Sequence, residues 1–247
     1  MITIRDLHKS FGEREVLHGI KTELRDGIIN QIIGKSGSGK TVLLKCVVGL
    51  LYPDRGDILY DGRSLIAMTK AQRHLLSQEM GMLFQGSALF DSMTVEENVL
   101  FPLQMFSKMT PAEQRRRARY CLDEVGLPDT LHLYPGELSG GMQKRAAIAR
   151  AIALNPKYLF CDEPNSGLDP LTSIKIDELI VSLTETYRMT TVINTHDMHS
   201  VCTIGQHIVF LQEGTQYWEG SKDELGCSGC DRLDTFLTAS GVAIEKL

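Results

Sequence analysis

The stretch that decides the fold is Gly34-Lys35-Ser36-Gly37-Ser38-Gly39-Lys40-Thr41, which fits the pattern G-x-x-x-x-G-K-[ST]. A β-branched, apolar run precedes it, and the residues from Thr41 to Leu50 can form a short helix. A strand, a glycine-rich loop and a helix in this order predict a phosphate cradle, because the loop N–H groups point inward and the helix adds the positive end of its dipole. We therefore predict a nucleotide site, with Lys40 on the β- and γ-phosphates and the Thr41 hydroxyl on Mg²⁺.

Length and composition set the broad class. The chain has 247 residues, of which 43% are apolar and 23% charged, as expected for a globular protein with a sizeable core. A net charge of −5 argues against nucleic acid as the main partner. No apolar run approaches the roughly 20 residues that span a bilayer, and the N-terminus has no secretory signal pattern. We expect a cytosolic chain.

Two adjacent acids end the apolar run Tyr158-Leu-Phe-Cys-Asp162, and the second of them is Glu163. Open parallel sheets bind their ligands at the carboxyl ends of their strands. Asp162 is suited to complete the Mg²⁺ shell. Glu163 is the better general base, because it can accept a proton from a water aimed at the γ-phosphate. These two acids are the predicted chemical centre.

Two further predicted strands lead to a polar residue at their carboxyl ends. The run Met80 to Phe84 is followed by Gln85, and the run Thr190 to Thr195 is followed by His196. We predict that His196 makes a polar contact to the γ-phosphate or to the attacking water.

A second anion-binding helix start is predicted at Leu138-Ser139-Gly140-Gly141-Met142, ahead of an alanine-rich helix former. Ser139 is the expected N-cap, and the two glycines leave backbone N–H groups unobstructed. One nucleotide already has its phosphates held by the first loop. The second cradle therefore suggests that another copy of the chain presents it to the far side of the γ-phosphate.

The remaining segments are predicted from local patterns. Residues 2–7 and 16–24 alternate as two strands around a turn that contains Phe11, an aromatic that can stack on adenine. From residue 86 to 156 the pattern becomes helical, with capping boxes beginning at Thr94 and Thr110. The second of these helices carries a cluster of arginines, which we interpret as a solvated face or a contact for anionic lipid or an acidic partner. This cluster consists of Arg115, Arg116, Arg117 and Arg119.

The six cysteines do not predict a metal or redox centre. Four stand singly in apolar or helical surroundings, and Cys227-Ser-Gly-Cys230 is a lone C-x-x-C without a second pair or a histidine at zinc spacing. We interpret the pair as loop thiols.

Together these motifs resemble the ATP-binding cassette (ABC) ATPases, in that family's order and over nearly the whole chain. The resemblance implies an α/β fold: a P-loop NTPase core with a mixed sheet flanked by helices, an N-terminal antiparallel β-subdomain and an inserted helical subdomain. In this division, residues 1–85 and 157–247 form the core, and residues 86–156 form the helical subdomain with the signature motif.

The resemblance also implies roles for individual residues. Gln85 joins Thr41 and Asp162 around Mg²⁺, and Gln85, Glu163 and His196 are the catalytic set. The residues expected to contact ATP are Phe11, Gly34, Ser36, Gly37, Ser38, Gly39, Lys40, Thr41, Val42, Ser139, Gly140 and Gly141. Two copies are expected to close head to tail on two ATP molecules, as a homodimer. Lys35, Val42 and Met142 depart from the commonest pattern without removing a phosphate contact.

A narrower resemblance rests on Gln-Gly-Ser-Ala-Leu-Phe-Asp-Ser-Met, residues 85–93. It is similar to the ATPase subunit of the Mla-type (Mkl) phospholipid transporters, which maintain outer-membrane lipid asymmetry. This implies a peripheral position on the cytoplasmic face of the inner membrane and an integral membrane permease bound at Gly86–Asn98. A lipid-binding mammalian-cell-entry protein would belong to the same complex. The chain ends soon after Leu237, without the longer extension that some Mla ATPases use to brace the dimer.

Other functions stay open from the sequence. The alternatives are an ABC ATPase for another cargo (lipoprotein release, an amino acid or a metal) and a non-transport scaffold, as in iron–sulfur assembly. The permease chooses the cargo, so the ATPase sequence alone does not separate them.

Overall fold

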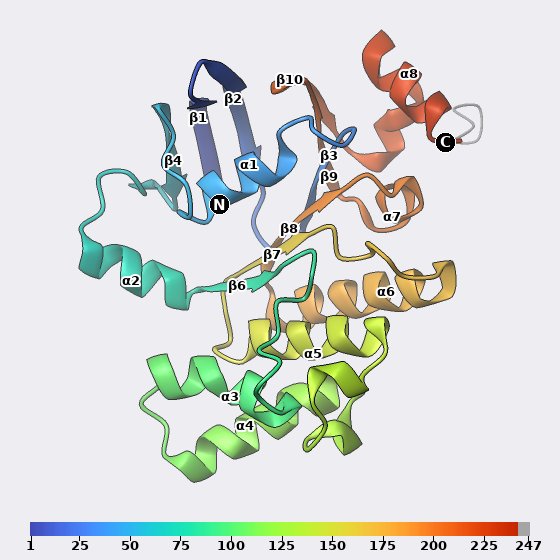
Figure 1. Ribbon diagram of the computed structural model, residues 1–247. Helices are drawn as coiled ribbons and strands as arrows, with labels where there is room; N and C mark the ends of the chain where they lie inside the picture. Colours follow the sequence, from blue (N-terminus) through green and yellow to red (C-terminus); the bar gives the residue numbers. More distant parts are fainter. Residues whose placement is uncertain (242–247) are drawn as a thin grey trace. The chain divides into compact units, whose positions relative to one another are not determined.

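The computed structural model describes residues 1–241, which form two compact units (Figure 1). The first unit contains residues 1–74 and the residues from 190 onward, and the second contains residues 75–189. The predicted helical insertion, 86–156, lies entirely within the second unit. Its exact boundaries stay a prediction. Among residues 1–241, no helix is both long enough and apolar enough to cross a membrane.

An antiparallel sheet opens the first unit, in the strand order β2-β1-β4-β5. Its strands are β1 (Ile2–Phe11), β2 (Arg14–Leu24), β4 (Arg55–Tyr60) and β5 (Arg63–Ser64). Ile2 and Ile4 are buried, as the alternation predicts, and one side of β1 faces a core. Leu7 is buried too, out of alternation, because the register of β1 against β2 shifts between Ile4 and Leu7. The two predicted N-terminal strands are confirmed, although both extend further and meet at the turn after Phe11.

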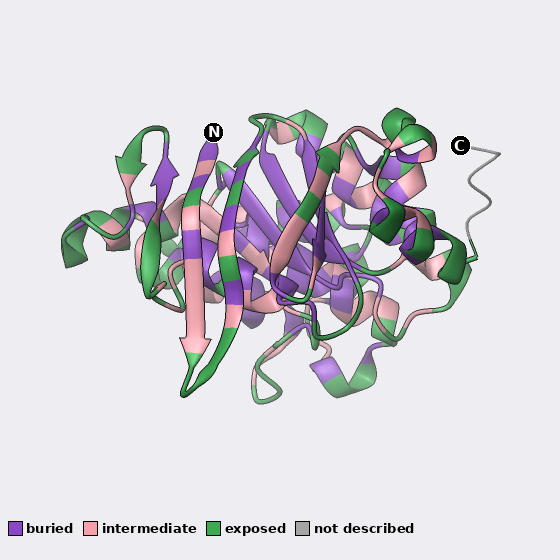
Figure 2. Cartoon of the chain, turned by 90° about the horizontal axis from the view of Figure 1, so that it is seen from above, coloured by how far each residue is buried: buried purple, intermediate pink, exposed green. Residues whose placement is uncertain are grey.

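Four more strands of the first unit lie in the order β10-β9-β3-β8. They are β3 (Ile29–Ile33), β8 (Thr190–Thr195), β9 (His207–Gln212) and β10 (Thr215–Gly220). β3 is parallel to both β8 and β9, whereas β10 is antiparallel to β9. Every residue of β3 and β8 is buried, as is typical of parallel strands covered on both faces (Figure 2).

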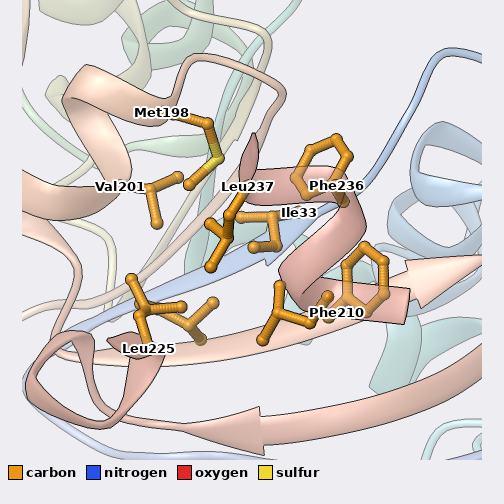
Figure 3. Packing of buried hydrophobic residues seen from close by; sticks show 9 residues of the cluster. Ile33, Met198, Val201, Phe210, Leu225, Phe236 and Leu237 are labelled. Carbon is orange, nitrogen blue, oxygen red and sulfur yellow. The ribbon is translucent and has the colours of Figure 1, made fainter. Parts of the chain in front are cut away.

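The C-terminal part of the first unit packs onto β3. Its helical elements are α7 (Met198–Ile204), the short 3₁₀ helix η3 (Lys222–Cys227) and α8 (Asp231–Ala239). Phe236 of α8 stacks against Phe210 of β9 with ring centroids 5.3 Å apart. Met198 and Ile33 belong to the same buried cluster (Figure 3). The strand before the phosphate loop and the helix after His196 therefore share one core with the C-terminal helix.

The second unit is mainly helical. Its elements include β6 (Met80–Leu83), α3 (Val95–Phe106), α4 (Pro111–Glu124), η1 (Pro128–Thr130), η2 (Pro135–Glu137), α5 (Gly140–Ile152), β7 (Tyr158–Asp162) and α6 (Pro170–Tyr187). A further helix, α2 (Lys70–Gln78), spans the boundary between the units. Both predicted capping boxes are confirmed, at Thr94 with Glu97 and at Thr110 with Glu113.

One member of the predicted arginine cluster points inward. Arg117 donates to the carbonyl oxygens of Ile152 (2.8 Å) and Ala153 (3.0 Å), and its guanidinium lies over the rings of Tyr120 and Tyr187. Its interpretation as part of a solvated face was wrong. The reason is helical periodicity: Arg117 lies on the same face as the buried Cys121, four residues further along α4, while Arg115 and Arg116 stay exposed.

Candidate nucleotide-binding and hydrolysis site

The phosphate loop connects β3 directly to α1 (Lys40–Val47). Gly34 passes so close to β9 that a Cβ atom would stand 2.1 Å from the Leu211 carbonyl oxygen, so only glycine fits. Gly39 caps α1 at φ +101°, in the left-handed region, and no side chain of the described residues caps this helix. The first turn of α1 therefore presents backbone N–H groups, the arrangement that binds anions.

Two polar side chains of the loop fit a phosphate ligand. Lys40 is buried, and its ammonium donates to the carbonyl oxygens of Gly34 (2.8 Å) and Lys35 (3.2 Å), which holds it folded over the loop. The Ser38 hydroxyl is also buried, and within the described chain it has no hydrogen-bond partner. A buried, unpaired hydroxyl beside a buried ammonium costs free energy unless a ligand bonds to it. The loop is thus chemically complementary to a polyphosphate.

His196 emerges beside the phosphate loop, at the same end of the same sheet. In the parallel pairing of β3 with β8, Ile33 lies opposite Thr195, so Gly34 and His196 follow at neighbouring strand ends. Asp197 then caps α7 by accepting from the His199 N–H at 3.0 Å, and its own N–H donates to the Thr195 hydroxyl at 2.9 Å. These bonds fix the backbone on both sides of His196, whose side chain is exposed.

Phe11 ends β1 and is 49% exposed. The Lys9 ammonium lies 5.5 Å from the centroid of its ring, so the ring is not packed into the core. An exposed aromatic at a hairpin turn is available for stacking, as its predicted role on adenine requires.

In the second unit, the predicted acids and Gln85 also emerge at one end of paired strands. β6 and β7 are parallel, with Leu83 opposite Cys161, so Gln85 and Asp162 follow at the same edge. Asp162 and Glu163 are both buried. The Gln85 side-chain amide donates to the Ser166 hydroxyl at 3.4 Å, which joins it to the turn after the acids.

The backbone at Glu163 is strained. Its φ is +51°, a left-handed conformation that costs free energy for a residue with a side chain. Its carbonyl oxygen accepts from the Ser166 N–H at 3.1 Å, and the Asn165 amide donates to Asp177 at 3.0 Å. The turn is therefore held by bonds to its own residues and to α6. Strain of this kind is common where a side chain must be aimed at a reacting group.

Sequence reasoning missed Lys144, which lies in the middle of α5. Its ammonium donates to the Gln85 carbonyl oxygen, and its side chain is buried. Burial lowers the pKa of Lys144, while the nearby carboxylates of Asp162 and Glu163 oppose that shift. A lysine in a polar stretch is usually solvated, and no local sequence signal indicates that α5 turns this one toward the acids.

The predicted helix start at Ser139 is confirmed. Its hydroxyl accepts from the Met142 N–H at 3.3 Å, as an N-cap does. Gly141 lies against α6, where a Cβ atom would stand 2.6 Å from the Thr172 methyl group. The glycine therefore allows α5 and α6 to begin side by side. A cavity of about 380 Å³ opens there, lined by Ser139, both glycines, Asp169 and Lys175 among others.

An apolar groove of about 430 Å³ lies beside the segment after Gln85. Phe84, Phe90 and Phe101 contribute to it, with the Phe90 and Phe101 ring centroids 4.9 Å apart. Arg150 donates to the Ser87 carbonyl oxygen at 2.9 Å and to that of Ala88 at 2.7 Å.

Asn98 anchors the same segment from the other side. It is buried, and its side-chain oxygen accepts from the Phe90 N–H at 2.8 Å. Its side-chain amide donates to the carbonyl oxygens of Phe90 (3.1 Å), Met93 (3.1 Å) and Thr94 (3.0 Å). Arg150 lines the groove, and Asn98 holds the backbone of the groove segment in place from behind.

Comparison with known families agrees with this geometry. The ABC transporter family matches residues 17–166, from within β2 to the turn after the acids. The chain therefore belongs to the ABC transporter family, and it is an ATP-binding, ATP-hydrolysing cassette. Among solved structures, the dimeric ABC transporter cassette MJ0796 is similar, with a TM-score of 0.82 and 31% identity over 90% of this chain and 99% of that one. It has also been solved in a post-hydrolysis state bound to ADP and Pi.

Three relatives of similar identity carry names that differ in the transported cargo. The intermembrane phospholipid transport ATP-binding protein MlaF of Haemophilus influenzae is 35% identical over 96% of this chain and 90% of its own length. The probable ribonucleotide transport ATP-binding protein mkl of Mycobacterium leprae is 37% identical over 85% of this chain, which spans 60% of that relative. The methionine import ATP-binding protein MetN of Protochlamydia amoebophila is 38% identical over 91% of this chain and 67% of its own length.

Proposed function

We propose that this ATPase drives phospholipid transport as the peripheral, nucleotide-binding subunit of a membrane transporter. The observation that carries the proposal is the likeness to MlaF, which extends over 96% of this chain rather than over the nucleotide motifs alone. The phospholipid cargo is proposed in addition to the ATPase role, because the methionine import ATPase MetN resembles this chain to a similar degree.

The reaction divides among the residues of the site as follows. The N–H groups of residues 34–41, the Ser38 hydroxyl and the Lys40 ammonium hold the phosphates, and Phe11 stacks on adenine. Glu163 accepts the proton of the attacking water. His196 makes a polar contact to the γ-phosphate or to the attacking water. Ser36, Gly37 and Val42 lie within or next to the same loop and are assigned to the nucleotide with it.

The proposed magnesium site uses oxygen donors only. Thr41 offers a hydroxyl, Gln85 an amide oxygen and Asp162 a buried carboxylate. Mg²⁺ prefers such hard oxygen ligands and keeps several waters and substrate phosphates in its shell. The metal would offset charge on the phosphates. These three residues would hold it, and Lys144 would keep the backbone at Gln85 in place.

We propose that two copies of the chain form the active unit. Ser139, Gly140 and Gly141 line a cavity on the surface, and none of them belongs to the unit that contains the phosphate loop. A second copy can present this helix start to the γ-phosphate held by the first. The dimeric state of the MJ0796 cassette supports this arrangement.

The permease is proposed to bind in the apolar groove beside Gly86–Asn98. Phe84, Phe90 and Phe101 provide an apolar surface, and Asn98 and Arg150 hold it in shape. A short amphipathic helix of a membrane protein fits such a groove. In a phospholipid transporter, a lipid-binding mammalian-cell-entry protein would complete the complex on the other side of the permease.

Affinity purification from membranes of the source cell tests the cargo. The expected result is co-purification of the chain with an integral membrane permease and with bound phospholipid, detected by mass spectrometry of the lipid extract. The matched variant Phe90→Asp should fold and hydrolyse ATP but lose the permease. A permease that carries methionine or another amino acid would favour the alternative suggested by MetN, and recovery without any membrane protein would contradict a transport function.

A further inference from the structure

Helices α3 and α4 are joined by a turn (Figure 1). Around this turn, apolar and basic side chains are exposed that neither the ATPase reaction nor the permease groove uses. Met105 is 59% exposed and Met109 43%. Three basic residues close to them in the sequence are also exposed: Lys108, Arg115 and Arg116. We call these five residues the α3–α4 tip, and we propose that the α3–α4 tip docks on the surface of an anionic lipid bilayer.

Hydrogen bonds hold the backbone of the turn in one conformation, so the positions from which its exposed side chains project are fixed. The Gln114 side-chain amide donates to the Leu103 carbonyl oxygen (3.2 Å), the Ser107 hydroxyl (3.3 Å) and the Met109 carbonyl oxygen (3.2 Å). The capping box of Thr110 with Glu113 fixes the start of α4. Because the turn is already ordered, less conformational entropy is lost when it binds a surface.

The positive charge of the α3–α4 tip is largely uncompensated. Within residues 1–241, Lys108, Arg115 and Arg116 take part in no ion pair, whereas Arg119 is paired with Glu96 at 3.3 Å. The acid closest to Lys108, Arg115 and Arg116 in the sequence is Glu113, whose carboxylate accepts from the N–H (2.7 Å) and the hydroxyl (2.8 Å) of Thr110. These bonds, with the charge of Arg116, hold the pKa of Glu113 below its ordinary value. The α3–α4 tip with Glu113 therefore keeps a charge of about +2 on a chain whose net charge is −5.

Exposed methionines favour a bilayer over an acidic protein as the occupant. Two unbranched apolar side chains next to basic ones can enter the headgroup boundary while the ammonium and guanidinium groups meet lipid phosphates. An acidic protein surface would offer charge but leave Met105 and Met109 in water. The α3–α4 tip combines both features of a membrane-surface segment.

The position of Met105 along α3 points the same way, and this step rests on the proposed permease groove. Phe101 and Pro102 line that groove, and Met105 lies four and three residues further along α3, on the same helix face. A permease helix seated in the groove would keep the end of α3 near the plane of the bilayer. The α3–α4 tip then continues one interface from protein to lipid.

Flotation of the full chain with vesicles tests the proposal without the permease. The chain is expected to float with phosphatidylcholine vesicles that contain phosphatidylglycerol and not with phosphatidylcholine alone, and added salt should release it. In the variant Arg115→Gln/Arg116→Gln, binding should fall roughly fivefold for each arginine removed. The matched control, Lys157→Gln/Arg188→Gln, removes the same charge from exposed positions outside the α3–α4 tip and should float like the parent.

Fluorescence tests the apolar contribution. In a chain whose single tryptophan is replaced by Trp218→Phe, the variant Met105→Trp should show a blue-shifted emission when phosphatidylglycerol vesicles are added. Glycerol phosphate at the same phosphate concentration should give no shift. A shift with glycerol phosphate alone would mean that the α3–α4 tip binds free phosphate groups, contrary to the proposal.

The proposal is overturned if the parent chain does not float with anionic vesicles, or if the Arg115→Gln/Arg116→Gln variant floats as well as the parent. ATPase activity of each variant is measured in parallel and should stay at the parent value. If the chain binds the permease but does not float with vesicles, the lipid contact is overturned and the proposed function stands. If the chain floats with vesicles but does not bind a permease, the proposed function is overturned and the lipid contact stands.

Discussion

Helices α1 and α5 both begin at a glycine-rich stretch, but they differ in what accepts hydrogen bonds from the N–H groups of their first turns. At α1 the N-cap is Gly39, and no described side chain accepts from the helix. At α5 the N-cap is Ser139, whose hydroxyl already accepts from Met142. An uncapped helix start needs an external acceptor, whereas a capped one is stable alone. The difference supports our proposal that α1 binds the nucleotide first and that α5 contacts it when a second copy closes.

The surroundings of the two helix starts support the same distinction. Near α1, the buried Ser38 hydroxyl has no hydrogen-bond partner within residues 1–241, and the buried Lys40 ammonium is held over the same loop by the Gly34 carbonyl oxygen. Near α5, the Asp169 carboxylate accepts from the hydroxyl (2.5 Å) and the N–H (3.0 Å) of Thr172, which also holds its pKa below the ordinary value. The start of α6 beside α5 is thus held by its own residues without a ligand.

The largest effect is expected from Glu163→Gln, which leaves both helix starts intact. Glutamine cannot accept the proton of the attacking water, so turnover should fall by about 10²- to 10⁴-fold, the usual contribution of a general base. ATP binding should persist and trap a dimer, because nothing reopens it. Steady-state hydrolysis and analytical ultracentrifugation with ATP measure the two effects. Normal hydrolysis would show that Glu163 is not the base.

Lys40→Ala should abolish ATP binding at the start of α1 and leave the start of α5 unchanged. Without the ammonium, the phosphates lose their main positive partner, and ATP should no longer raise the melting temperature. At an ATP concentration a hundredfold above Kd, the parent should gain about 2.7 kcal/mol of stability from the ligand. The matched control is Lys35→Ala, an exposed lysine of the same loop, which should retain the shift. An unchanged shift in Lys40→Ala would remove Lys40 from the site.

The strands, turns and helix caps near the nucleotide motifs could be predicted because local rules determine them. A capping box depends on residues three apart, and this was sufficient for Thr94 and Thr110. The phosphate loop likewise requires only a strand before it and a helix after it. The sequence alone could therefore place the helix starts and the strand ends that this comparison uses.

Features that depend on distant packing could not be predicted in this way. Lys144 contacts the Gln85 carbonyl because α5 packs beside β6, and Arg117 bonds carbonyl groups at the end of α5. In the sequence, both residues stand among other polar ones. Helix α2 was also missed, because Leu76 is its only buried residue and no apolar stripe marks it. α7, with seven residues, is too short to show a period.

Ser139 can be tested with a pair of variants that separate its two roles. Ser139→Ala removes the cap and should cost about 1 kcal/mol of stability as well as most ATPase activity. Ser139→Asp keeps the cap and should melt like the parent, but its carboxylate repels the γ-phosphate of the facing copy, so hydrolysis should still be lost. Both should bind ADP as the parent does, since α1 is untouched. Weakened ADP binding by the isolated chain would contradict the division of roles between α1 and α5.

The smallest effect is expected at a third helix start, to which we assign no contact with the nucleotide. Thr110 caps α4 by the same geometry as Ser139 caps α5, with its hydroxyl accepting from the Glu113 N–H at 3.4 Å. Thr110→Ala should therefore cost about 1 kcal/mol of stability, as Ser139→Ala does, while kcat and KM for ATP stay at the parent values. Urea unfolding and steady-state kinetics on the two variants make the comparison direct. Equal losses of stability with unequal losses of activity would show that Ser139 acts on the nucleotide rather than through the fold, and equal losses of both would mean that α5 only needs to be folded.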